Sequence, residues 1–322
     1  MIGGSFVTWI SGLATAALPH DPVKDKEPRV FPTVVELLQG EGNFISFTHR
    51  EHPGNRIGYR FHEHSPYVLG AIPTAAEQHE IEAVSRLETE FAGRPGAFKN
   101  AREVREAGWI PQDWTFYIAP ASEGFDLLWV VQTHESGLNT YYAVQQCFRM
   151  SGATNEAWRR KVAETPAFSE FDLWATQKAA GDPLTSLSYV HSGGRWLAIP
   201  ATQDTLGFRT RLGFEMDTAR TGGNLKAATY EPYNPAFSDE VLDTGLAART
   251  DAKGEWICAL YWEHTTHVTD HHPADCLHAV VNLGPLAPQS KRAIRGKIYW
   301  FKGSLDDLYT KWQADFHFSG VR

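Results

Sequence analysis

The chain is poor in cysteine, with three in 322 residues: Cys147, Cys258 and Cys276. The count is odd and no CxxC pair occurs, so we expect no disulfide framework, although a single bridge stays open. Cys147 and Cys258 lie in apolar, strand-like runs, where we expect them to pack as small buried hydrophobic side chains.

The sequence also lacks long apolar runs, excess positive charge and nucleotide-binding loops. It has no run of eighteen apolar residues and therefore predicts no membrane-spanning helix. The net charge of −8 argues against a nucleic-acid-binding protein, which normally has a basic surface. GxGxxG and GxSxG motifs are absent, and so is the strand–helix alternation of an α/β fold. Residues 1–18 are mildly apolar without a basic start, so the sequence leaves open a cytoplasmic or an exported protein.

What the chain has is many short apolar runs divided by glycine and proline. This pattern predicts a mainly β protein: one large antiparallel β-sandwich or supersandwich, jelly-roll-like, extending over residues 1–322 as a single domain. A few peripheral helices are expected, the first two as an insertion at about 74–108. These helices are predicted over residues 74–91, 97–107, 155–164, 168–180 and 304–316.

Eleven tryptophans are many for this length. On a β scaffold we expect most of them to fill the core, because the indole ring buries a large apolar area. The alternative is a platform on which a sugar ring stacks, and Trp262 is our candidate for that role.

Nine of the fourteen histidines fall in two clusters, and the first lies in a predicted β-hairpin within residues 43–62 and just beyond it. If side chains alternate strictly along its second strand, Arg60, His62 and His64 share one face and Glu63 points the other way. Two imidazoles at this spacing can chelate a metal, so His62 and His64 are candidate ligands and Arg60 a candidate substrate-binding residue. The alternative is that these histidines are exposed or hydrogen-bonded near a strand end.

The second cluster follows a strand-like run, so we expect a loop at one end of the sheet, where binding residues concentrate. Its members are His264, His267, His271, His272 and His278. His264 and His267 are the candidate catalytic acid or base, because the free pKa of histidine lies near neutral pH.

One segment of this cluster, Pro273–Asn282, reads PADCLHAVVN and resembles the second motif of the cupin family, PxGxxHxxxN, with Asp275 at the glycine position. The resemblance implies a β-barrel with a metal held by His62, His64 and His278. A glutamate expected after the first cupin motif is missing, and the separation is longer than cupins use. A single divalent metal is the one cofactor that the sequence suggests.

Polar residues also interrupt the apolar strand predicted over residues 139–150. Tyr141, Gln145 and Arg149 share one face of it. Buried polar groups must be hydrogen-bonded, so this face borders either a binding site or a structural network. In a site, Gln145 and Arg149 would bind sugar hydroxyls or a carboxylate, and Tyr141 would stack or transfer a proton.

These patterns predict a protein that acts on a glycan or sugar derivative as a lyase, hydrolase or epimerase, with a small molecule or oligosaccharide as its partner. Two alternatives stay open: a cupin-like metal-dependent oxygenase or isomerase, and a glycan-binding β-sandwich without catalysis. A glycosidase needs two carboxylates on opposite sides of the bond, and the sequence does not distinguish among its candidates. These candidates are Glu51, Glu63, Asp126, Glu135, Glu215 and Glu263.

Overall fold

The computed structural model describes ten stretches of the chain: residues 34–41, 44–68, 81–104, 111–138, 141–149, 185–200, 205–228, 235–251, 253–271 and 276–317. The mildly apolar segment 1–18 and the helices predicted over residues 155–164 and 168–180 lie outside these stretches.

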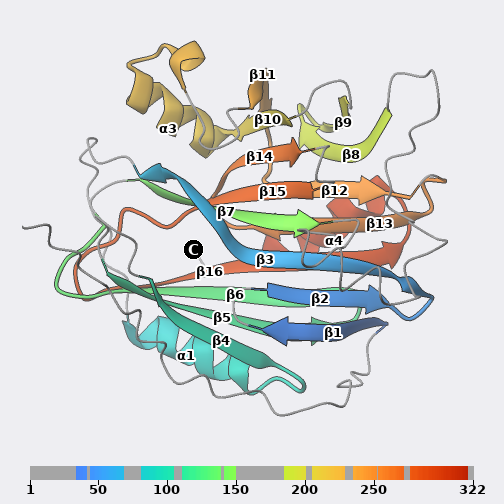
Figure 1. The fold of residues 1–322 in the computed structure, drawn as a ribbon, viewed down its shortest axis with the longest axis horizontal. Helices are drawn as coiled ribbons and strands as arrows, with labels where there is room; N and C mark the ends of the chain where they lie inside the picture. Colours follow the sequence, from blue (N-terminus) through green and yellow to red (C-terminus); the bar gives the residue numbers. More distant parts are fainter. Residues whose placement is uncertain are drawn as a thin grey trace, which may run out of the picture.

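The described strands form two eight-stranded sheets that pack face to face (Figure 1). In spatial order, sheet A contains β1 (Val35–Glu41), β2 (Phe44–His49), β3 (His52–Val68), β7 (Tyr142–Arg149), β15 (Cys276–Asn282), β14 (Thr265–His271), β10 (Thr205–Thr210) and β11 (Ala236–Leu242). Sheet B contains β4 (Phe98–Val104), β5 (Gln112–Ala121), β6 (Gly124–Thr133), β16 (Lys291–Lys302), β13 (Trp256–Trp262), β12 (Ala247–Thr250), β8 (Thr185–Ser192) and β9 (Arg195–Pro200).

Neighbouring strands are antiparallel throughout the described sheets, except that β10 and β11 run parallel. The predicted fold class, a large and mainly antiparallel β-sandwich with a few helices, is confirmed. No helix in the described stretches has the length and apolar character needed to cross a membrane.

The inner faces of both sheets share one hydrophobic core, and its largest side chains are tryptophans. Trp114, Trp129, Trp262 and Trp300 are all completely buried there. Trp114 and Trp129 meet edge to face with ring centroids 5.1 Å apart, a favourable aromatic geometry. No tryptophan of the described stretches is exposed, so for these residues the core interpretation is the one that the structure supports.

Three helices lie on the outer faces of the described sheets (Figure 1). α1 (Ile81–Ala92) packs on β5 and β6 of sheet B, and α4 (Leu305–Phe316) packs on β13 and β16 of the same sheet. α3 (Arg211–Thr221) packs on the outer face of sheet A, where the side chain of Met216 lies on Ala143 of β7 and Val280 of β15, and the turn η2 (Leu225–Ala227) follows it.

The helix boundaries test the sequence prediction directly. α4 begins where expected, because Ser304 and Asp307 form a reciprocal capping box at its first turn. The helix predicted over residues 97–107 is wrong: Phe98–Val104 is strand β4, which pairs with β5 at every one of its positions. This pairing overrides local helix propensity, since each strand residue satisfies backbone groups on its neighbour.

Candidate active site

The candidate site lies on the outer face of sheet A and begins with an irregularity in β3. Arg60 of β3 pairs with Cys147 of β7, and His64 pairs with Gln145, so three residues of β3 lie opposite one residue of β7. Such a bulge interrupts the alternation of side chains along the strand. Residues of β3 beyond the bulge therefore lie on the face opposite to the one expected from strict alternation.

The bulge moves Glu63 and His62 to the faces opposite those expected. Glu63 lies on the outer face with Arg60, whose Nη1 is 3.8 Å from Glu63 Oε1. The ring of His62 instead packs edge to face on Trp114 of the core, with centroids 5.1 Å apart. The expectation that Arg60 and His62 share a face is thus wrong, and the side chain of His64 lies outside the described part of the structure.

The Glu63 carboxylate is the centre of the site, and its side chain is only 4% exposed. It accepts hydrogen bonds from Gln145 Nε2 at 3.0 Å and from Arg149 Nη2 at 2.9 Å. His278 Nε2 of β15 lies 3.3 Å from Glu63 Oε2, the oxygen that also accepts the hydrogen bond from Gln145. The structure therefore brings together three residues predicted from the sequence, Gln145, Arg149 and His278, around a glutamate that the sequence did not distinguish.

His278 is held from both sides. Its Nδ1 lies 3.0 Å from the hydroxyl oxygen of Thr269 on the neighbouring strand β14, and its Nε2 faces Glu63. Burial of the ring lowers the pKa of His278, but the Cys147 sulfur and the Glu63 carboxylate outweigh this and raise it to about 9. Burial likewise works against the charged form of Glu63, yet the His278, Arg149 and Gln145 contacts hold its pKa well below its usual range. At neutral pH the pair is an imidazolium beside a carboxylate.

A second imidazole, His271, borders this pair. It ends β14, is half-buried, and its ring centroid is 6.3 Å from that of His278. Burial lowers the pKa of His271, and the nearby charge of His278 lowers it further, although Glu63 acts in the opposite direction. Two histidines in one site thus have pKa values displaced in opposite directions, the arrangement by which proteins separate an acid from a base.

Cys147 and Cys276 flank His278, and both are free and buried. One ligand atom from each of these three residues lies within 4.8 Å of the other two, the only such group found in the described stretches. Burial raises the pKa of the Cys147 thiol well above its ordinary value, with Cys276 adding to the effect, so it is a neutral thiol at neutral pH. Nδ1 of His278 lies 3.0 Å from the Thr269 hydroxyl and Nε2 forms an ion pair with Glu63 at 3.3 Å, so a metal bound at either nitrogen would displace one of these contacts.

The three-histidine metal site implied by the cupin resemblance does not come together. The rings of His62 and His278 lie on opposite faces of sheet A, one in the core and one beside Glu63. The residues therefore do not fit that metal site, and we derive no chemistry from it.

The second histidine cluster was predicted to be a loop, but only its beginning is one. Glu263 and His264 form a tight turn, with His264 exposed at a φ of 59°, and Thr265–His271 is strand β14 in the interior of sheet A. The strand is polar yet buried because its backbone pairs with β10 and β15 and its side chains find partners on β15 and α3.

His267 belongs to a separate buried network. It has no exposed surface, and its Nε2 lies 3.3 Å from Asp217 Oδ2 of α3. Arg209 Nε of β10 donates to the same carboxylate oxygen at 2.8 Å, and Arg220 lies 3.7 Å from the other oxygen. Gly213 allows this close docking, because a Cβ there would come within 1.9 Å of the Thr266 carbonyl oxygen. This network fastens α3 to sheet A.

Tyr141 and Trp262, the other predicted site residues, lie apart from Glu63. Tyr141 is half-buried and packs on the cluster formed by Ala143, Met216 and Val280 under α3. Trp262 is in the core between the sheets, where its indole N–H donates to the Tyr59 hydroxyl at 2.8 Å. Neither residue borders the Glu63–His278 pair through any contact that we observe among the described residues.

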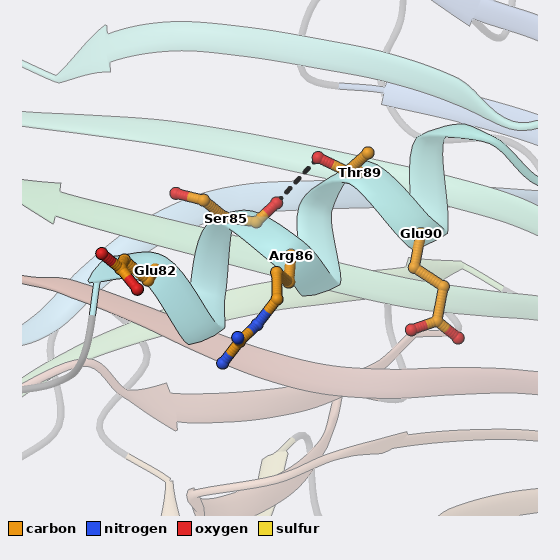
Figure 2. Close-up of a pocket in the computed structure, with 5 residues that line it drawn as sticks. All are labelled: Glu82, Ser85, Arg86, Thr89 and Glu90. Carbon is orange, nitrogen blue, oxygen red and sulfur yellow. Dashed lines mark hydrogen bonds between the residues drawn. The ribbon is translucent and has the colours of Figure 1, made fainter.

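Two surface depressions lie on the other side of the sandwich, over sheet B. The larger, of about 610 Å³, follows α1, and Figure 2 shows that its five lining side chains point in different directions. The smaller, of about 230 Å³, lies between α1 and α4, and its charged groups pair with one another, as Lys297 does with Asp315 at 2.9 Å. Neither depression is lined by a histidine or a cysteine.

No family model and no curated protein matches the chain. Solved structures similar to it include a putative aldose 1-epimerase from Escherichia coli K12, at 9% identity and a TM-score of 0.33 over 64% of this chain and 66% of that one, just under two thirds of its length. They also include the Slr1438 protein from Synechocystis sp. PCC 6803, at 10% identity and a TM-score of 0.38 over 84% and 93% of the two chains. A galactose mutarotase-like protein from Lactobacillus casei ATCC 334 matches at 10% identity and a TM-score of 0.33, over 83% of this chain and all of that one. Likenesses at these values carry no argument about activity, so function is argued from the site.

Proposed function

We propose that the protein is a carbohydrate-active enzyme that interconverts isomers of a sugar, as an epimerase or mutarotase, by acid–base catalysis on the outer face of sheet A. The observation that carries this proposal is the pairing of His278, held as a cation by Glu63, with the half-buried His271 6.3 Å away. The two rings are close enough to reach atoms of one sugar ring.

Mutarotation is the simplest reaction of this class. His271, the neutral imidazole, accepts the proton of the anomeric hydroxyl, while His278 donates a proton to the ring oxygen as the bond from that oxygen to the anomeric carbon breaks. The open-chain aldehyde rotates, and when the ring closes on the other face His278 takes back the proton of the attacking hydroxyl while His271 returns its proton to the anomeric oxygen. The 3.3 Å contact from His278 Nε2 to Glu63 is longer than an ordinary charge-assisted hydrogen bond, so a substrate oxygen can compete for that proton.

Glu63, Arg149 and Gln145 position the acid rather than react. The hydrogen bonds from Arg149 and Gln145 fix the carboxylate, and the carboxylate keeps His278 protonated. Hydrolysis is less well supported. A glycosidase uses two carboxylates on opposite sides of the scissile bond, and Glu63 is the only carboxylate in contact with His278 among the described residues.

The test is acceleration of anomer exchange, measured by polarimetry or by saturation-transfer NMR on a panel of aldoses and uronates. We expect wild-type protein to accelerate exchange of at least one sugar, and H271Q and H278Q to abolish the effect while keeping the folded spectrum. The exposed His264→Gln variant is the matched control and should retain activity. Equal activity of H278Q and wild type would refute the proposal.

The pH profile provides a second test. Activity requires His271 neutral and His278 protonated, so kcat/KM should rise through a pKa below 6.5 and fall through one near 9. A profile without the alkaline limb would remove His278 as the acid.

A further inference from the structure

The groups around Glu63 have an excess of positive charge. Arg60, Arg149 and the protonated His278 all approach a single carboxylate. The chain as a whole has a formal net charge of −8, so this local excess departs from the rest of the protein. A substrate that carries negative charge would balance it.

Arg149, which borders Glu63, has one buried donor without a hydrogen-bond partner. The residue is 8% exposed, and one of its terminal nitrogens donates to Glu63. Its Nε is buried and has no hydrogen-bond partner in the structure. A buried donor without a partner costs about 1–3 kcal/mol, so an acceptor supplied by a ligand would be stabilising there.

Arg60 provides the second donor group at the edge of the site. Its nearest atom lies 3.8 Å from the Glu63 carboxylate, beyond hydrogen-bond distance, and its side chain is 30% exposed. The bulge in β3 turns Glu63 onto the face that Arg60 and His278 already share. The planar donor fork of arginine fits a carboxylate or phosphate in two parallel hydrogen bonds.

We propose that the sugar bound at this site carries an anionic group, a carboxylate or a phosphate, which Arg60 and Arg149 recognise. This inference rests on the proposed function, because it names the substrate class of the same site. Arg60 is the specificity-determining residue, since it contacts no group that takes part in proton transfer at hydrogen-bond distance.

The experiment compares binding of two matched pairs of sugars by isothermal titration calorimetry at low ionic strength: galactose with galacturonate, and glucose with glucose 6-phosphate. We expect the anionic member of at least one pair to bind about tenfold or more tightly than the neutral member, given the strength of hydrogen bonds to charged groups. The pair that shows the preference identifies carboxylate or phosphate as the recognised group.

Variants then assign the preference to its residue. Arg60→Gln should weaken binding of the anionic sugar about tenfold and leave the neutral sugar unchanged. Arg50→Gln is the matched control, since Arg50 is bound to Glu36 at 2.7 Å at the turn between β2 and β3, and it should change neither. Equal binding within both pairs, no binding of either pair, or a preference that Arg60→Gln leaves intact would each overturn the inference.

Turnover is measured separately, so the two proposals can fail independently. Selective binding of an anionic sugar whose anomers are not exchanged faster would reject the proposed function and leave the inference standing. Accelerated anomer exchange of neutral sugars, together with equal affinity for the anionic and neutral members of each pair, would reject the inference and leave the proposed function standing.

Discussion

The replacement Glu63→Gln tests how the site sets the protonation of His278. The amide keeps the shape of the carboxylate and removes its charge. The Cys147 sulfur and the Glu63 carboxylate both raise the pKa of His278 against the effect of burial, and Glu63 acts through a hydrogen bond as well as through its charge. Without the carboxylate, we expect the pKa of His278 to fall from about 9 toward its ordinary value of 6.5.

The effect on activity should grow with pH. With a pKa of about 9, His278 is almost fully protonated at pH 7 and about nine-tenths protonated at pH 8. With a pKa of 6.5, about a quarter is protonated at pH 7 and about 3% at pH 8, so protonation alone predicts a loss of about 4-fold at pH 7 and about 30-fold at pH 8. Wild type and variant should therefore diverge as pH rises.

The free energy of unfolding of the wild-type protein should also depend on the protonation of His278, and it should decrease as pH rises. The folded state holds the His278 proton up to about pH 9, whereas an unfolded chain releases it near pH 6.5. The contribution, about 3 kcal/mol, is complete below pH 6.5 and is lost as pH rises through 9. In Glu63→Gln this decline between pH 6.5 and 9 should be absent.

Two measurements decide the outcome: NMR titration of the His278 ring, and urea unfolding from pH 6 to pH 9.5. Glu215→Gln on the surface of α3 is the control, because its side chain is 56% exposed, and it should match wild type in both. A His278 that still titrates near pH 9 in Glu63→Gln would refute the reasoning.

Three further predictions concern residues outside this pair. Trp262→Phe removes the hydrogen bond to Tyr59 in the core, so it should lower the free energy of unfolding by about 1–3 kcal/mol while sugar affinity in calorimetry stays the same; weaker sugar binding in a stable protein would support the stacking role instead. Asp217→Asn leaves the Arg209 guanidinium buried without its counter-charge and should cost about 3–5 kcal/mol in urea unfolding, whereas a cost near zero would contradict the role of this network in docking α3. Treatment with 1,10-phenanthroline should leave anomer exchange unchanged, since His62 and His278 lie on opposite faces of sheet A and cannot hold one metal, and loss of activity restored by zinc would show that a metal is required.

The candidate site was predictable in part. The polar face of the strand at Gln145 and Arg149 stands out in the sequence because such residues in an apolar strand need partners, and the structure supplies Glu63 as the partner of both. Glu63 itself was one of six comparable carboxylates, and no sequence signal marks the bulge that turns it toward them. His271 was one of five clustered histidines, and only its distance to His278 distinguishes it.

By itself the sequence determined the fold class, the burial of most of the tryptophans that the structure describes and the start of α4, because alternation along strands, apolar area and helix capping act over a few neighbouring residues. Tertiary structure alone decided which face each histidine occupies. A bulge in β3 interrupts the alternation of side chains, so the residues beyond it lie on the face opposite to the one expected from the sequence. The partners that set the protonation of His278 come from strands far apart in the chain. His62 therefore lies in the core, and His278 lies beside Glu63.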